Sequence, residues 1–216
     1  MFIAKRNDIN HIYTGKEIQT LISQSHYPTL EYNFSCPICN REVEYNGLST
    51  KYLLDFFVHK DGTPDCFAAE SISGGHQIVA EITVKALHNR INELTGEPVE
   101  INVEKWIGTQ PNFVIADVKI TNPVQIAAEI YHKASKLALY RRLRRMFSNG
   151  YRTYLIFHTG GRHDVDRVEQ YIQRIAPLKV GRFNPETLEL TLGDLFTEEQ
   201  VKLSRYNREL LPRYVR

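Results

Sequence analysis

The chain has few cysteines, no long apolar run and no repeated or low-complexity segment, and each absence excludes a class of protein. Three cysteines are an odd number and do not make the disulfide framework of a small secreted domain. No window of about 18 apolar residues occurs, so we expect no membrane-spanning helix. The first residues become polar too early for a signal peptide. These absences favour a reduced, cytoplasmic protein with no membrane partner.

What the chain does have is an ordinary globular composition with an uneven charge distribution. Hydrophobic residues make up 42% and charged residues 24%, which excludes wholesale disorder and allows one or two domains. The formal net charge is only +2, yet no acidic residue occurs between Lys133 and Ser148. This segment holds six basic residues, which are Lys133, Lys136, Arg141, Arg142, Arg144 and Arg145. Such a cationic stripe indicates a polyanionic partner, and the alternative is a solvated helix face.

Turn residues and apolar spacing divide the first part of the chain into segments. Short strands are expected in residues 1–35, and a small turn-rich module follows in residues 36–75. A helix that ends at Gly96 is predicted next, with five apolar residues at helical spacing: Ala80, Val84, Leu87, Ile91 and Leu94. Three apolar runs separated by turn residues then predict antiparallel hairpins: Val99–Trp106, Phe113–Ile120 and Val124–Tyr131.

The remainder predicts helices around one further strand. A helix over His132–Phe147 is expected to turn four apolar side chains toward the core, which are Leu137, Tyr140, Leu143 and Phe147. Tyr151–His158 is typical of a buried strand, and a later helix is marked by Val168, Tyr171, Ile172 and Ile175. This order predicts an α/β protein of the α+β type, with a mixed sheet flanked by helices. We expect an N-terminal module over residues 1–72 and a larger domain over residues 73–216 with a basic C-terminal tail.

All three cysteines lie within one short part of the chain. Cys36 and Cys39 flank a two-residue knuckle, and His59 and then Cys66 follow. This set suits a tetrahedral structural Zn²⁺, which can supply the folding free energy of a turn-rich segment. The alternatives are a chance knuckle with a surface His59, and a thioredoxin-like pair.

Two acidic residues interrupt runs that otherwise predict buried strands. Asp117 lies in the second run and Glu129 in the third. A buried carboxylate needs a cation, because a lone buried charge is too costly. On adjacent strands the two could share one Mg²⁺, with the carbonyl of Ile130 as a third ligand. The alternative is a salt bridge to Lys119 or Arg142.

The predicted helix before Gly96 carries polar residues along the border of its apolar face. Glu81, Lys85 and His88 follow the spacing i, i+4 and i+7. His76 lies at the start of this helix, where an N-terminus attracts phosphate. Each of these residues could instead be solvated or capping.

These motifs, taken in order, resemble the PD-(D/E)XK nuclease superfamily and, within it, the competence CoiA-like nuclease family. Tyr32–Cys39 resembles the family's zinc-ribbon-like knuckle, and Phe56–His59 resembles its aromatic–His element. Ile115–Val118 resembles its Ala-Asp-Val strand. Ala128–Ile130, a basic helix and then Tyr154–Phe157 resemble its Glu strand, Arg-bearing helix and final strand.

The resemblance implies a restriction-endonuclease-like fold with a small N-terminal zinc-ribbon-like module. It also implies divalent-metal-dependent hydrolysis of DNA phosphodiester bonds, in DNA processing, recombination or defence. Asp117 and Glu129 would hold Mg²⁺ or Mn²⁺, and Glu81 would bind the ion directly or through water. Lys133 would orient the nucleophile. The DNA backbone would be contacted by Arg141, Arg142, Arg144 and Arg145.

One position departs from the superfamily pattern. The third catalytic position, two residues after Glu129, is usually Lys and is Tyr131 here. Lys133 or Lys119 could supply the cation instead. The alternative function is a catalytically inactive nuclease-fold protein that binds nucleic acid, and a third is a zinc-stapled protein-interaction domain. The oligomeric state, including a homodimer, stays open.

Overall fold

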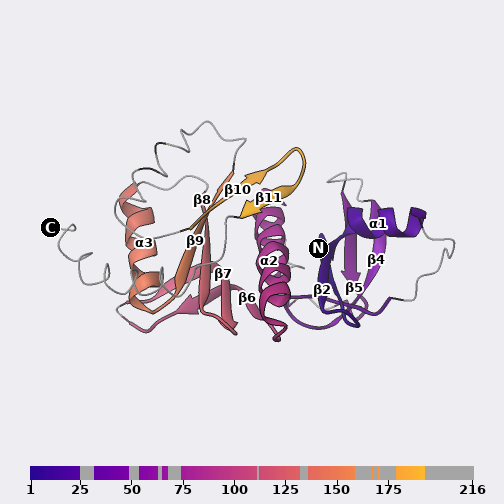
Figure 1. The fold of residues 1–216 in the computed structure, drawn as a ribbon, viewed down its shortest axis with the longest axis horizontal. Coiled ribbons are helices and arrows are strands. Elements are labelled where there is room, and N and C mark those ends of the chain that lie inside the picture. The colour runs from indigo at the N-terminus through magenta and orange to yellow at the C-terminus, as the bar shows by residue number, and fades with distance from the viewer. Residues whose placement is uncertain are drawn as a thin grey trace. The chain divides into compact units, whose positions relative to one another are not determined.

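The computed structural model describes residues 1–24, 32–48, 54–62, 65–67, 74–110, 112–131, 136–158, 167, 170 and 179–192. These residues form an α+β chain with two sheets and three helices, and the chain divides into two compact units, Met1–Ile101 and Asn102–Arg216 (Figure 1). None of the described helices combines the length and the apolar character needed to span a membrane.

The first unit contains a five-stranded antiparallel sheet in the order β2-β1-β3-β4-β5. Its strands are β1 (Ile3–Arg6), β2 (His11–Thr14), β3 (Phe34–Ser35), β4 (Glu42–Leu48) and β5 (Asp55–His59). Its helices are α1 (Gly15–Gln24) and α2 (Gly74–Thr95). The expected domain boundary between residues 72 and 73 lies inside this unit, because α2 packs on β1 and β2.

Helix α1 was not expected, although the sequence carries a capping box for it. The Glu17 amide donates to Thr14 Oγ1, and the Glu17 carboxylate accepts from the Thr14 amide at 2.7 Å. This reciprocal pair satisfies N–H groups that a helix start leaves without partners. The Thr-x-x-Glu spacing therefore explains why a helix interrupts a segment in which only strands were predicted.

Helix α2 follows its predicted apolar pattern closely. Four of the five expected core residues are fully buried, which are Ala80, Val84, Leu87 and Ile91. Leu94 is 57% exposed because it lies in the last turn, beyond the surface that α2 covers. Gly96 ends the helix with φ of +67°, and its N–H donates to the Asn92 carbonyl at 2.8 Å.

The second unit contains a six-stranded mixed sheet in the order β11-β10-β9-β8-β7-β6. Its strands are β6 (Glu100–Ile107), β7 (Val114–Asn122), β8 (Ile126–Tyr131), β9 (Arg152–His158), β10 (Lys179–Asn184) and β11 (Glu189–Leu192). β7 and β8 are antiparallel, whereas β8, β9 and β10 are parallel neighbours. Helix α3 (Lys136–Ser148) connects β8 to β9 and packs against the sheet (Figure 1). The predicted mixed sheet with a helical crossover is confirmed here.

One of the four residues predicted for the core face of α3 is exposed, and Leu139 and Met146, which were not predicted, are buried. Leu139, Leu143 and Phe147 pack with Tyr131 of β8 and with two residues of β9. Leu137, predicted to face the core, is 54% exposed. Because it lies four residues before the exposed Arg141, it shares the outer side of the helix. The later helix was marked by Val168, Tyr171, Ile172 and Ile175, and these residues lie outside the described part of the chain.

Candidate metal centres and nucleic-acid interface

The two knuckle cysteines lie in a tight turn between β3 and β4. The Cys36 amide donates to the Arg41 carbonyl, and the Asn40 amide donates back to the Cys36 carbonyl, both at 2.8 Å. Asn40 adopts a positive φ of 59°, a conformation that Asn tolerates better than most residues. The Ile38 amide also points at Cys36 Sγ, at 3.4 Å. The turn thus places backbone donors around one of the two sulfur atoms.

The other two predicted zinc ligands meet the knuckle at the same place. His59 ends β5 and is the register partner of Val43 at the start of β4. Its Nε2 lies 3.2 Å from Cys39 Sγ, and Cys66 Sγ lies 3.7 Å from Cys36 Sγ. All four ligand atoms lie within 4.8 Å of one another. The four residues that the sequence singled out therefore form a Cys₃His cluster that can hold Zn²⁺.

Burial disfavours the thiolate forms of the cysteines in this cluster when no metal ion is bound. Cys36 and Cys66 are buried in an apolar cluster with Phe34, Val43 and Phe57. The hydrogen bond with Cys66, together with burial, raises the pKa of the Cys36 thiol in the absence of a metal ion. Burial also raises the pKa of Cys39. Because thiolates are the form that ligates zinc, a bound cation would reverse these shifts.

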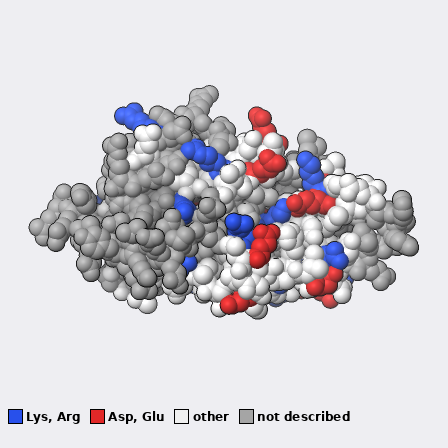
Figure 2. All heavy atoms as spheres, in the orientation of Figure 1, with Lys and Arg blue, Asp and Glu red and all other residues white. Residues whose placement is uncertain are grey.

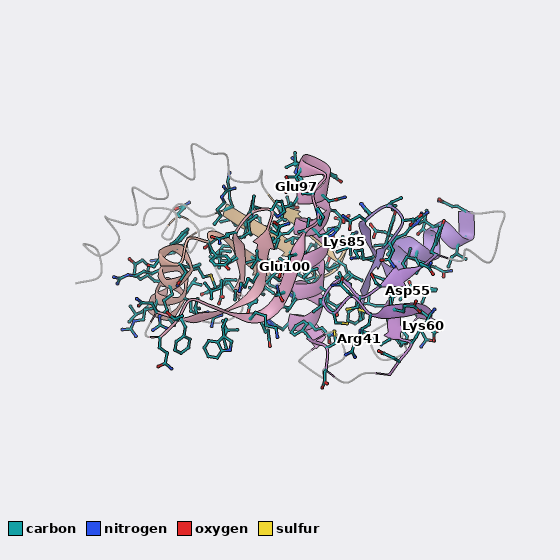
Figure 3. The ribbon with its side chains drawn as sticks, turned by 90° about the horizontal axis from the view of Figure 1, so that it is seen from below. Arg41, Asp55, Lys60, Lys85, Glu97 and Glu100 are labelled. Atoms are coloured by element: carbon teal, nitrogen blue, oxygen red, sulfur yellow. The ribbon has the colours of Figure 1, made fainter. Side chains whose placement is uncertain are left out.

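The charged side chains near the cluster pair at the surface instead of entering it. Arg41 forms a 3.6 Å ion pair with Asp61, and Lys60 forms a 3.4 Å ion pair with Glu42. Figure 3 shows Arg41 and Lys60 at this end of the first unit, near the sulfur atoms. No acidic side chain is among the four candidate ligands. A soft thiolate and imidazole set of this kind favours Zn²⁺ over Mg²⁺.

The second candidate site lies where β7 and β8 cease to pair. Their register runs from Ile120–Ile126 to Val118–Ala128 and stops before Asp117 and Glu129, while β8 stays paired with β9 as far as Tyr131. The Ile130 amide donates to Asp117 Oδ2 at 2.6 Å. The Asp117 carboxylate therefore accepts a hydrogen bond from a backbone amide of β8 at a position where β8 no longer pairs with β7. The structure brings Asp117 close to Glu129 and to the amide of Ile130, whereas the prediction for Ile130 concerned its carbonyl.

Arg142 of α3 is the cation that faces these two carboxylates. Its Nη2 donates to Glu129 Oε2 at 2.7 Å, and its Nε lies 2.5 Å from Oε1. The same guanidinium lies 3.9 Å from Asp117 Oδ1 and donates to the Ile115 carbonyl at 3.0 Å. Of the two partners considered from the sequence, Arg142 thus makes the salt bridge. Lys119 instead donates to the Trp106 carbonyl at 3.1 Å.

The environment of Glu129 disfavours its negative charge despite this ion pair. Burial and the neighbouring Asp117 carboxylate raise the pKa of Glu129 to about 7, against the opposing effect of Arg142. The guanidinium is 37% exposed, so water weakens its field at the carboxylate. At Glu129, burial and the neighbouring Asp117 carboxylate therefore outweigh the effect of the half-exposed Arg142. The oxygen atoms of the two carboxylates are ligands of the kind that Mg²⁺ or Mn²⁺ takes, but they make two candidate ligands, not three.

The remaining predicted catalytic residues do not add to this pair in the described structure. Tyr131, which occupies the position where the superfamily usually has Lys, is buried against Phe157 in the core beneath α3. Lys133 lies outside the described residues. Glu81 belongs to the first unit, where its buried carboxylate accepts from the Phe2 amide and from Gln77 Nε2.

The other polar residues of α2 also have their described contacts within the first unit. Lys85 pairs with Glu17, and His88 Nδ1 lies 3.2 Å from Asn89 Oδ1. His76 is half-buried in the first turn of α2, as predicted for a residue near a helix N-terminus. Burial raises the pKa of Glu81 and lowers the pKa of His88. These residues join α2 to its own unit.

The arginines of α3 occupy different sides of the helix. Arg141 and Arg145 are exposed, Arg144 is half-buried, and Arg142 turns to the carboxylates. Within the described part of the chain, no ion pair joins Arg141, Arg144 or Arg145 to an acid. By contrast, the described acidic and basic side chains are interspersed on the face drawn in Figure 2. Helix α3 therefore presents cations that internal ion pairs do not neutralise.

Sequence reasoning missed an aromatic pair beside this helix, of which one ring is exposed. Trp106 near the end of β6 packs on Phe113, with ring centroids 4.6 Å apart, and Trp106 is 56% exposed. The available signal was a lone tryptophan just before a Gly-Thr-Gln-Pro turn.

Comparison with family models, with curated proteins and with solved structures finds no match to this chain. Its membership of a nuclease family therefore stays a prediction from the sequence motifs.

Proposed function

We propose that this chain is a metal-dependent DNA nuclease with a restriction-endonuclease-like second unit. The observation that carries the proposal is the pair of buried carboxylates, Asp117 and Glu129, at the point where β7 and β8 separate. Strand separation exposes one N–H group, which Asp117 binds, and leaves Glu129 facing α3. Both acids are buried and lie close enough to repel each other, and both also lie within reach of the Arg142 guanidinium.

The repulsion between the Asp117 and Glu129 carboxylates supports the binding of a divalent cation. The raised pKa of Glu129 reflects repulsion that a second cation would relieve. When bound there, Mg²⁺ or Mn²⁺ would polarise a phosphoryl oxygen and lower the pKa of an attacking water. Asp117 and Glu129 would hold the ion, and Arg142, already within reach of both, would offset the charge that remains. Arg142 would then orient the carboxylates instead of contacting DNA.

The cationic side of α3 would supply the contacts to the DNA backbone. Arg141 and Arg145 lie one helical turn apart and are both exposed. Arginine side chains that bind phosphates release counterions and add affinity that is independent of base sequence. We therefore assign the exposed arginines to substrate binding and the half-exposed Arg142 to the metal site.

The Cys₃His cluster would hold a structural Zn²⁺ in the first unit. Its four ligands come from the β3–β4 turn, the end of β5 and the segment that contains Cys66. One ion would thus cross-link three parts of a small unit. Since all four protein ligands are in place, this site would be closed and structural, with no position left open for a substrate.

A gel assay with defined DNA substrates tests the nuclease proposal. Linear, circular and branched DNA, single- and double-stranded, would be incubated with the full chain in Mg²⁺, in Mn²⁺ and in EDTA. We expect products with a divalent ion and none with EDTA. Cleavage of no substrate in either metal would contradict the proposal.

The second candidate is a protein of the same fold that binds nucleic acid without cutting it. Two observations favour it: Tyr131 is buried in an apolar cluster where a catalytic Lys is usual, and Arg142 already pairs with Glu129. Calorimetric titration with Mg²⁺ separates the two candidates. A catalytic site should bind the ion and lose it in Asp117→Asn, whereas a site neutralised by Arg142 should show no such binding.

A further inference from the structure

The β6–β7 hairpin carries an aromatic pair, the exposed Trp106 and the half-buried Phe113, that the proposed chemistry does not use. Trp106 and Phe113 pack with an interplanar angle of 57°. The next residue on each strand, Ile107 and Val114, is buried in a cluster with Met146 of α3. The two rings therefore pack on each other while their neighbours fill the core. Trp106 is 56% exposed, so a large part of its ring is open to solvent although it also packs on Phe113.

The hairpin that carries these rings is fixed to the C-terminal end of the arginine helix. Asn149 Nδ2 donates both to the Asn112 carbonyl at 2.9 Å and to the Arg145 carbonyl at 2.8 Å. Gly108 has a φ of +79° and packs so closely against Asn149 that a side chain there would collide with it. The Asn149 side chain thus bridges Asn112, which precedes Phe113, and Arg145, whose side chain is exposed.

The segment of the second unit that holds the aromatic pair is rich in basic residues. Between Asn102 and His158 the chain has nine Lys and Arg residues and three Asp and Glu residues. Two of those three acids are Asp117 and Glu129, which face Arg142. Lys119 Nζ lies 3.1 Å from the Trp106 carbonyl, so an ammonium group adjoins the aromatic pair. The surface therefore offers flat aromatic faces within a field that attracts anions.

We infer that Trp106 and Phe113 form a stacking platform for unpaired nucleobases and that the chain engages DNA through a single-stranded segment. A single strand presents phosphates and open base faces together, which matches rings beside cations. A duplex keeps its base faces stacked inside, so it would meet the arginines and leave the aromatic pair unused. The inference deepens the proposed function, on which it rests, by assigning unpaired DNA as the preferred substrate.

Trp106 is the one tryptophan of the chain, so its fluorescence reports on this surface alone. The full chain would be titrated at low salt with fluorescein-labelled oligothymidylate and with the matching duplex. Anisotropy of the label measures binding, and quenching of Trp106 in parallel titrations with unlabelled DNA measures stacking. We expect the single strand to quench Trp106 and the duplex to bind without quenching.

Substitution of the ring provides the matched comparison. Trp106→Ala should weaken oligothymidylate binding about tenfold, as expected for the loss of one stacked base. Trp106→Phe should recover most of that loss. Leu137→Ala removes a side chain that is equally exposed, at 54%, and should leave affinity unchanged.

The outcomes separate the inference from the proposed function. If oligothymidylate binds but leaves Trp106 fluorescence and the affinity of Trp106→Ala unaltered, the platform is overturned and DNA binding stands. If neither DNA raises the anisotropy, the platform and the proposed function are both overturned. If DNA is cut although Trp106 never responds, only the platform fails.

Discussion

At the scale of single residues, Glu129 is subject to opposing electrostatic effects from two neighbours. It lies between a carboxylate that repels it and a guanidinium that attracts it, and its pKa is raised to about 7. Repulsion and burial therefore outweigh the ion pair. The sequence predicted which residue types would meet at this point, because a charge within a buried strand needs a partner. It left open whether that partner was Lys119 or Arg142, which depends on how α3 crosses the sheet.

The free energy of unfolding should depend on pH through the titration of Glu129. The group binds its proton more tightly in the folded chain, with a pKa of about 7 against 4.5 when unfolded. The stability this gives is complete below pH 4.5 and is lost as the pH rises through about 7. In metal-free buffer, the wild type should therefore lose stability between pH 5 and pH 8 relative to Glu129→Gln. Thermal melts at each pH measure the difference.

At pH 8 without metal, Glu129→Gln should match or exceed the wild type, by up to about 1–3 kcal/mol. Arg142 stays half-exposed in the variant and can be solvated. The matched control is Glu104→Gln, which alters an exposed acid of the same unit and should leave the melt unchanged. If Glu129 is instead a structural partner of Arg142, the variant should lose about 3–5 kcal/mol. That loss would argue against a metal site.

At the scale of secondary-structure elements, the helices show what periodicity can and cannot predict. The apolar spacing of α2 identified its core residues, whereas the same reasoning misassigned Leu137 in α3. A helix with arginines on three sides has no clean polar face, so its first turn is ambiguous. The sequence of α1 contains a capping box, but the alternation of Tyr and Ile in residues 1–35 favours strands, so the pattern alone predicted no helix there.

The exposed arginines of α3 give a prediction about DNA binding. Replacing Arg141 and Arg145 by Ala should weaken binding about equally for different sequences and lower the slope of log affinity against log salt by about 2. Leu137→Ala, on the same outer side of the helix, controls for loss of helix stability. Filter binding at several salt concentrations measures the slope. A slope that does not change would mean that the two arginines are only solvated.

The buried Asn89 side chain hydrogen-bonds α2 to β2. Asn89 accepts from the Ile12 amide at 2.9 Å and donates to the Ile12 carbonyl at 2.8 Å, and it is buried. Asn89→Ala leaves both backbone groups without that partner and should cost about 2 kcal/mol. Asn92→Ala, which removes half-buried contacts to Asn10, should cost less. Equal losses in urea unfolding would show that the Ile12 contacts carry no special weight.

At the scale of the whole molecule, the sequence predicted which cysteines and histidine form a cluster, whereas the predicted boundary before residue 73 lies inside the first compact unit. The spacing of Cys36, Cys39, His59 and Cys66 was sufficient to predict their cluster, because few arrangements of thiols and imidazole have another use. The boundary was placed before α2 because composition changes there. The contacts of Glu81 and Asn89 with β1 and β2 join α2 to the first unit, and no local signal reveals such long-range hydrogen bonds.

Loss of zinc should unfold the first unit. The purified chain should carry about one Zn²⁺, since four ligands close one tetrahedral site. Cys36→Ser should lower the metal content and the solubility, while Lys60→Gln, beside His59 but paired at the surface, should change neither. Metal analysis of freshly purified protein provides the measurement. Protein that is folded and free of zinc would rule out the structural role.

The most direct test of the account compares DNA cleavage by three matched proteins in Mg²⁺. Wild type, Asp117→Asn and Glu104→Gln would be assayed on the same labelled DNA, with folding checked by thermal melts. The account predicts that the wild type and Glu104→Gln cut the DNA, and that Asp117→Asn is folded but inactive. A folded Asp117→Asn protein that cuts DNA as fast as the wild type would contradict the claim that the Asp117–Glu129 pair is a catalytic metal site.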